Sequence, residues 1–282
     1  MKINKNSFAL RFYRIFSANS VPAASAEMSY YLLFAFFPII MVVYASFSLV
    51  GRANPDFLSG FAMLLPTSVS QLIDSFILHI SSSSSNLSFL LTGIMITLFS
   101  VTKFTRSVKA KVRNIYAVTN SSSFVTEWLI SAIFSVLLLA VFYITLFVMI
   151  LGEHIINLIS NHFILSAFAY KLIQVLRYSI TGFVVLFIIL LFYYIIPNVR
   201  QKFTDVILGT VFTVIGWLLV SLIFTFYMNN FSNYSVVYGS LGAFIILLLW
   251  FYMMSMLLLA GAVINSMVYN GKRNIKIGYT QK

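Results

Sequence analysis

The sequence predicts an all-α, polytopic membrane protein with six transmembrane helices and additional amphipathic interfacial helices. Of its 282 residues, 61% are hydrophobic and only 9% are charged, which excludes a soluble globular domain. Long apolar runs recur along the chain, and the last two hold no charged side chain between Asp205 and Lys272. Lys and Arg gather in alternate connections, as in multi-pass membrane proteins. We expect a basic segment at residues 1–26, a membrane domain at 27–269 and a basic tail at 270–282.

The N-terminal segment has basic residues and apolar residues at helical spacing, which predicts an amphipathic helix on the inner leaflet. The first span is expected at residues 28–50, too long for the apolar region of a signal peptide. Pro38 lies in its middle and should kink it, because proline removes a backbone donor.

The apolar residues that follow the first span do not form another continuous apolar run. Residues 69–80 carry apolar side chains at i, i+3, i+4 and i+7 with polar ones opposite, which predicts an interfacial helix. Five serines at 81–85 form a link. The remaining spans are expected at 87–102, 128–151, 178–196, 206–227 and 241–268. The fourth is stopped by Pro197-Asn198.

The positions of the basic residues predict the topology. With both termini in the cytoplasm, fifteen of the eighteen Lys and Arg residues lie inside, leaving only Arg52, Lys171 and Arg177 outside. The net charge of +12 is then explained by topology, so we expect no nucleic-acid partner.

The few acidic residues are expected to be structural. Glu27, Glu127 and Asp205 each stand at the inner start of a span and follow a hydroxyl residue, which is typical of a helix N-cap. Glu27 has a second interpretation, an ion pair with Lys103 or Arg106. The central part of each span lacks acidic, basic and His residues, which disfavours proton antiport.

No metal, cofactor or enzyme active site is expected. There is no cysteine, and His79, His154 and His162 lack the spacing of a zinc site. Two interpretations of the basic run stay open: it enforces topology, or it also holds anionic lipid head groups. Its members are Lys103, Arg106, Lys109, Lys111 and Arg113.

The last span carries small and polar residues. Gly261 and Asn265 share a face, which predicts close helix packing and an amide that bonds across helices. Trp250 lies some two turns below Gly242, deeper than indoles prefer, which also permits a cavity-lining role.

Three segments carry a family resemblance. They are Tyr30-Tyr31 to Pro38, Phe192-Tyr-Tyr-Ile-Ile-Pro197-Asn198, and Tyr238-Gly-Ser-Leu-Gly242 followed by Trp250-Phe-Tyr and Gly261-Ala-Val-Ile-Asn265. Together they resemble the YihY/BrkB family of bacterial inner-membrane proteins. The resemblance implies six helices with both termini inside, a link to envelope integrity, and a bacterial cytoplasmic membrane as location. Relatives usually have an acid in the closing motif, where this chain has Val263.

The function expected is non-enzymatic: moving or accommodating a lipid-like or small amphipathic substrate. The alternative is a membrane scaffold or regulator acting through partner proteins. The partners expected are membrane lipids, and either a second copy of the chain or an envelope protein. The residues expected to bind substrate or line a cavity are Glu27, Tyr30, Tyr31, Pro38, Tyr193, Tyr194, Pro197, Asn198, Tyr238, Gly239, Gly242, Trp250, Tyr252 and Asn265.

Overall fold

The regular structure of the described residues is entirely helical in a computed structural model of the chain. The structure describes residues 8–49, 71, 75, 76, 78, 87–118, 125, 128–129, 131–133, 135–136, 139–140, 143, 167–231 and 240–272. Its long helices are α1 (Phe8–Ala18), α2 (Val21–Leu49), α5 (Leu87–Ile115), α7 (Ala167–Ile195), α8 (Phe203–Phe231) and α10 (Ser240–Lys272).

The N-terminal segment folds as the predicted amphipathic helix, α1. Arg11 and Arg14 are exposed on it, whereas Ile15 is buried. The helix ends because Ser20 adopts a positive φ of 47°, and the side-chain amide of Asn19 donates to the Ile15 carbonyl at 2.9 Å. The helix that contains the first expected span, α2, therefore begins at residue 21, seven residues before the expected start of that span.

This earlier start corrects the N-cap prediction for Ser25 and Glu27. Both residues lie inside α2, and the buried hydroxyl of Ser25 donates to the Val21 carbonyl at 2.8 Å. Glu27 is exposed, and its alternative ion pair with Lys103 or Arg106 stays a prediction. Pro22 is tolerated in the first turn, where backbone N–H groups have no intrahelical acceptor.

The second expected span and the basic run after it form one continuous helix, α5. Its 29 residues make it roughly 44 Å long at 1.5 Å per residue, against about 30 Å for the hydrocarbon core of a bilayer. The basic part of α5 therefore extends beyond the length that an apolar core can cover.

The turn between α7 and α8 follows the predicted stop at Pro197-Asn198. Asn198 has a positive φ of 53°, and its N–H donates to the Ile195 carbonyl at 3.1 Å. At the start of α8, a carboxylate oxygen of Asp205 accepts from the Lys202 N–H at 3.0 Å. This confirms the predicted role of Asp205 at a helix N-terminus, although Thr204 is exposed.

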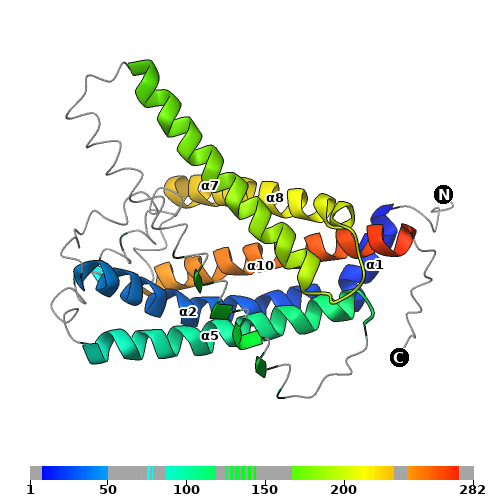
Figure 1. Ribbon diagram of the computed structural model, residues 1–282, viewed down its shortest axis with the longest axis horizontal. Helices are drawn as coiled ribbons and strands as arrows, with labels where there is room; N and C mark the ends of the chain where they lie inside the picture. Colours follow the sequence, from blue (N-terminus) through cyan, green and yellow to red (C-terminus); the bar gives the residue numbers. More distant parts are fainter. Residues whose placement is uncertain are drawn as a thin grey trace.

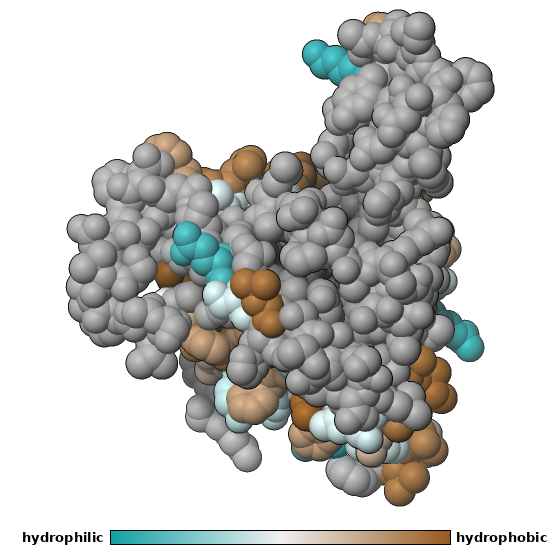
Figure 2. Space-filling view, turned by 90° about the vertical axis from the view of Figure 1, so that its left-hand side faces the viewer, coloured by the Kyte–Doolittle hydropathy of each residue, from teal (hydrophilic) through white to brown (hydrophobic). Residues whose placement is uncertain are grey.

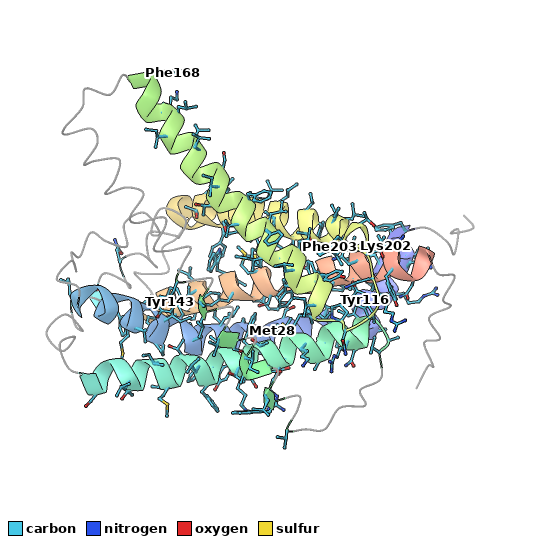
Figure 3. All side chains as sticks on the ribbon, in the orientation of Figure 1. Met28, Tyr116, Tyr143, Phe168, Lys202 and Phe203 are labelled. Carbon is cyan, nitrogen blue, oxygen red and sulfur yellow. The ribbon has the colours of Figure 1, made fainter. Side chains whose placement is uncertain are left out.

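Helices α2, α5 and α10 run side by side, and α8 lies along α10 (Figure 1). Helix α7 crosses α8, and its N-terminal end points away from the other helices (Figure 1). Helix α1 and the C-terminal end of α10 lie at one end of the bundle, together with Tyr116 after α5 and Lys202 before α8 (Figures 1 and 3). The described basic residues of α1, the last turns of α5, the α7–α8 turn and the end of α10 therefore gather at a single end, which we call the basic end.

Two apolar clusters stabilise the bundle. The first lies toward the basic end and includes Met28, Val112, Tyr193, Leu259 and Val263, all less than 2% exposed. The second joins α2, α8 and α10 and contains Phe36, Ile40, Phe224, Ile246, Leu247 and Phe251. Many large apolar side chains of α7 and α8 remain exposed, and apolar side chains, in brown, also appear on the face shown in Figure 2. That surface is suited to lipid.

Three described helices are long and apolar enough to cross a membrane. The candidate spans are Val21–Val42, Phe203–Phe226 and Phe244–Gly271, and a shorter apolar helix covers Ser179–Ile195. They overlap the first, fifth, sixth and fourth expected spans. The third expected span falls largely outside the described residues.

The expected interfacial helix at 69–80 is described at four positions, all helical: Gln71, Ser75, Phe76 and Leu78. The Ser75 hydroxyl donates to the Gln71 carbonyl at 2.8 Å. Phe76 meets Phe37 of α2 with ring centroids 5.2 Å apart, so this helix packs against the second cluster.

Candidate functional site

Buried polar side chains extend inward from the basic end. They come chiefly from α5, α8, α10 and the α7–α8 turn. Polar groups inside a membrane bundle need partners, because hydrocarbon offers none. The members used below are Thr102, Thr105, Lys109, Arg113, Tyr116, Gln201, Asp205, Thr213, Asn265, Ser266 and Asn270.

One part of this region is a closed hydrogen-bond network that joins three helices. The hydroxyl of Tyr193 donates to the Leu258 carbonyl at 2.6 Å and lies 2.7 Å from Thr213 Oγ1. Tyr193 is completely buried, and Thr213 Oγ1 lies 2.8 Å from the Gly209 carbonyl. The network therefore ties the end of α7 to both α8 and α10.

A close contact between α8 and α10 lies beside this network. The Gly209 N–H donates to Asn265 Oδ1 at 2.7 Å. A Cβ added at Gly209 would overlap the Gly261 carbonyl and the Asn265 amide, and one at Gly261 would overlap Thr213 Oγ1 and Tyr193 Oη. Only residues without a side chain permit this approach. The structure confirms the predicted close packing at Gly261 and the predicted interhelical bond of Asn265.

The α7–α8 turn is held by Gln201. Its Nε2 donates to the Tyr193 carbonyl at 2.8 Å and to the Tyr194 carbonyl at 3.0 Å, so it satisfies carbonyls left open at the end of α7. The ring of Tyr194 stacks on Phe203 at 4.2 Å between centroids. These contacts fix where α8 begins.

A second part of the region is a polar stripe on α5. Thr102, Thr105, Lys109, Arg113 and Tyr116 follow one another at intervals of three or four residues, so they share one side of the helix. Each is less than 10% exposed. Thr105 Oγ1 lies 2.9 Å from the hydroxyl of Ser135, which links the stripe to the helical segment around residues 131–136.

The other cations of α5 lie outside this stripe. Lys111 Nζ donates to the Asn19 carbonyl at 3.0 Å and so joins α5 to the α1–α2 turn. Lys103 Nζ sits 5.5 Å from the centre of the Phe99 ring, a cation–π contact. The basic run therefore divides into half-buried side chains and the buried pair Lys109 and Arg113.

Tyr116 is the last residue of the polar stripe. Its ring contacts that of Tyr269 on α10, with centroids 5.7 Å apart. Burial raises the pKa of the Tyr116 phenol above its ordinary value, and the neighbouring Tyr193, Asp205 and Tyr269 raise the pKa further. The hydroxyl therefore keeps its proton at physiological pH and can donate a hydrogen bond.

Several buried polar atoms have no hydrogen-bond partner among the described residues. Three are donors at the basic end, namely Tyr116 Oη, Asn265 Nδ2 and Asn270 Nδ2, and Gln201 Oε1 is an acceptor. Leaving such a group unpaired costs about 1–3 kcal/mol, so each needs an explanation. Together they make this part of the interior rich in donors.

The residues expected to bind substrate or line a cavity lie in different parts of the structure. Tyr193, Pro197 and Asn265 are buried near the network, whereas Glu27, Tyr30 and Asn198 are exposed. Tyr31, Pro38, Tyr194 and Tyr252 are half-buried and Gly242 is buried. Tyr238 and Gly239 lie outside the described residues.

Trp250 has a packing contact that bears on its expected role. Its Nε1 lies 3.4 Å from Ser221 Oγ on α8, and the side chain packs against the second cluster. The hydrogen bond gives the indole N–H a partner at this depth.

Sequence reasoning missed Gly209, Thr213, Gln201, Tyr116 and Asn270. A signal was present for the first two, because Gly209 and Thr213 are small residues four apart in an apolar helix, a pattern typical of close packing. Nothing in the sequence indicated the role of Gln201, since a single amide residue in a turn is common.

No metal site emerges from the part of the chain that the structure describes. Among those residues, no three or more His, Asp, Glu or Cys side chains come together. Val263, at the position where the family resemblance implies an acid, is completely buried in the first cluster.

Fold and site together define an all-helical membrane protein with a polar interior at one end. The chain matches the family described as Virulence factor BrkB over residues 12–280 and belongs to that family. It is 27% identical over 267 residues to the ribonuclease-like protein YfkH of Bacillus subtilis, covering 95% of this chain and 97% of the relative. It is 24% identical over 273 residues to the UPF0761 membrane protein NTHI0384 of Haemophilus influenzae, covering 94% and 96%. No solved structure matches the chain.

Proposed function

We propose that this protein is a multi-pass component of the bacterial cytoplasmic membrane that translocates or accommodates a lipid-like or small amphipathic substrate. Both termini and the basic end face the cytoplasm in this proposal, because Lys and Arg are retained on that side. The role is non-enzymatic and contributes to envelope integrity.

The observation that carries the proposal is the polar stripe on α5, buried in a bundle whose other helices expose many large apolar side chains. Lys109 and Arg113 are each 6% exposed, and the surrounding helices present large apolar side chains to their surroundings. An amphipathic molecule needs both environments, a polar site for one end and an apolar surface for the other. A helix that only anchors a protein in the membrane needs no buried Lys or Arg side chain.

A nuclease function has less support. The name of the Bacillus relative contains the word ribonuclease-like. Metal-dependent hydrolysis of a phosphodiester needs converging acidic or His ligands, and none gather among the described residues. Asp205, which is buried, already accepts a hydrogen bond from the Lys202 backbone.

Reconstitution tests the proposal directly. Purified protein in liposomes is given head-group-labelled and fatty-acid analogues in one leaflet, and their appearance in the other leaflet is followed by chemical quenching. We expect faster exchange than in protein-free liposomes for at least one amphipathic class. Unchanged exchange for every class, together with stoichiometric crosslinking to an envelope protein in cells, would replace this proposal with a scaffold role.

A further inference from the structure

The α7–α8 turn, residues 196–202, joins two apolar helices at the basic end. An apolar helix segment, Ser179–Ile195, ends directly before the turn, and the candidate span Phe203–Phe226 begins directly after it. Apolar segments of this kind lie in the hydrocarbon core, whereas charged side chains at its edge lie among the lipid head groups. The turn is therefore at head-group level, and Lys202 directly precedes the first residue of the span (Figure 3).

Hydrogen bonds hold the backbone of this turn at both of its ends. Toward α7, Gln201 Nε2 donates to the carbonyls of Tyr193 and Tyr194 at 2.8 and 3.0 Å. Toward α8, the Lys202 N–H donates to a carboxylate oxygen of Asp205 at 3.0 Å. The backbone is therefore ordered before a ligand arrives, which lowers the entropy cost of binding.

Two cations are exposed on the turn. Arg200 and Lys202 are two residues apart, so their Cα atoms lie within about 7 Å of each other. A single lipid head group can meet both side chains over this distance. Its phosphate would accept charge-assisted hydrogen bonds from Arg and Lys.

An apolar surface begins beside these cations. The ring of Tyr194 stacks on that of Phe203, with centroids 4.2 Å apart and planes 11° apart. Phe203 is nevertheless 50% exposed, and Ile207, one turn further along α8 on the same side, is 45% exposed. Charge at head-group level above an exposed apolar surface matches the order of the parts in a phospholipid.

The basic run of α5 differs from the turn in its exposure. Lys111 Nζ donates to the Asn19 carbonyl at 3.0 Å, and Lys109 and Arg113 are buried. Those side chains are therefore engaged inside the protein, although the run holds more cations than the turn. Exposure favours the turn as the segment that meets lipid head groups.

We propose that the α7–α8 turn is a binding surface for an anionic phospholipid in the leaflet at the basic end. Arg200 and Lys202 contact the head-group phosphate, and the stacked rings of Tyr194 and Phe203 contact the glycerol and the first carbons of the acyl chains. The proposal goes beyond the proposed function, because it requires a membrane around the turn but no movement of lipid through the protein.

The test measures the retention of phosphatidylglycerol and phosphatidylcholine, with identical acyl chains, by detergent-purified protein in native mass spectrometry. We expect wild-type protein to prefer phosphatidylglycerol by at least about tenfold, since each exposed cation contributes about fivefold. The double variant Arg200→Gln with Lys202→Gln should lose most of this preference. Arg14→Gln is the matched control, because it removes an exposed cation of α1 at the same end of the bundle and should keep the preference.

Phe203→Ala tests the apolar part of the surface. It removes the ring that stacks on Tyr194, so the retention of both lipids should fall by a similar factor while their ratio stays unchanged. A fall confined to phosphatidylglycerol would contradict contact of this ring with the lipid body. If Phe203→Ala is not monodisperse, the Gln variants still decide the question, because they change only exposed side chains.

Two results would overturn the proposed surface. One is equal retention of the two lipids by wild-type protein. The other is a loss of preference in Arg14→Gln as large as in the double variant, because the charge of the whole basic end would then attract the lipid. Phosphatidylglycerol preference without leaflet exchange of any lipid supports the surface and contradicts the proposed function, and exchange without preference does the reverse.

Discussion

Asn265 Oδ1 accepts a hydrogen bond from the Gly209 backbone at 2.7 Å, joining α10 to α8 inside the bundle. The Asn265 side chain is completely buried. Such a bond matters in a membrane because the amide has no water to replace its partner. It also explains why an amide is present in the small-residue segment at the end of α10.

Replacing this amide should loosen the pair of helices. We expect Asn265→Ala to lower the free energy of unfolding by about 1–2 kcal/mol, since it removes an interhelical bond and leaves a small void. Thermal unfolding of the detergent-purified protein measures the effect. Ser266→Ala is the control, because that hydroxyl donates to the Val263 carbonyl of its own helix and makes no other hydrogen bond among the described residues. Equal losses in the two variants would argue against the bond.

The contact of the two glycines predicts a sharp steric effect. Gly209→Ala and Gly261→Ala should each destabilise the protein by more than about 2 kcal/mol, because the new methyl group meets backbone or bonded side chains. Gly182→Ala has open space and should be neutral or stabilise α7 by up to about 1 kcal/mol. The three variants are compared by size-exclusion chromatography after heating. A stable Gly261→Ala protein would show that the helices can separate.

The Tyr193 hydroxyl should contribute to stability through its two partners. Tyr193→Phe leaves the Leu258 carbonyl and the Thr213 hydroxyl with one partner fewer, so we expect a loss of about 1–2 kcal/mol. Tyr194→Phe is the matched control, since the Tyr194 ring stacks on Phe203 and that contact survives the change. The thermal unfolding of both variants is measured by circular dichroism. A Tyr193→Phe protein as stable as Tyr194→Phe would contradict the network.

Tyr116 predicts a stability loss at alkaline pH. Its pKa is raised in the folded protein, so the unfolded phenol ionises first as the pH passes about 10. The stability contribution is therefore complete below that pH and declines as the pH rises toward the folded pKa. Melting temperatures at pH 8 and about pH 11 should differ less in Tyr116→Phe than in wild type. An identical difference would contradict the burial of this hydroxyl.

Topology can be tested because the chain has no cysteine. Single cysteines introduced at exposed Asn114 or Thr204 should react with impermeant thiol reagents only from the cytoplasmic side. Cysteines at Ser83 and Asn233, in connections expected outside, should react only from the outer side. If the Asn114→Cys protein reacted with the reagent from the outer side, the orientation would be opposite to the one proposed.

The sequence was most informative where a physical signal repeats along the chain. Apolar run length predicted helices at the positions of α2, α8 and α10, and small residues beside an amide predicted the Gly261 and Asn265 contacts. It was least informative about single side chains. Ser25 was assigned to a cap because hydroxyl and acid stood together, yet α2 had already begun at Val21.

Burial of Lys109 and Arg113 could not be predicted from composition, because a run of cations normally indicates a solvated surface. Only the packing of α2 and α10 against α5 makes one side of that run internal. The spacing of Thr102, Thr105, Lys109, Arg113 and Tyr116 is visible in the sequence, but it does not reveal which side faces inward.

The contact between Lys111 and the Asn19 carbonyl has a consequence for biosynthesis. The two residues are separated by 92 positions, so the α1–α2 turn leaves the ribosome well before the ammonium group that binds it. At about 5–20 residues per second, this interval lasts roughly 5–20 seconds. During that time the first helices are inserted without their partner on α5. The N-terminal segment can make this contact only after Lys111 has been synthesised.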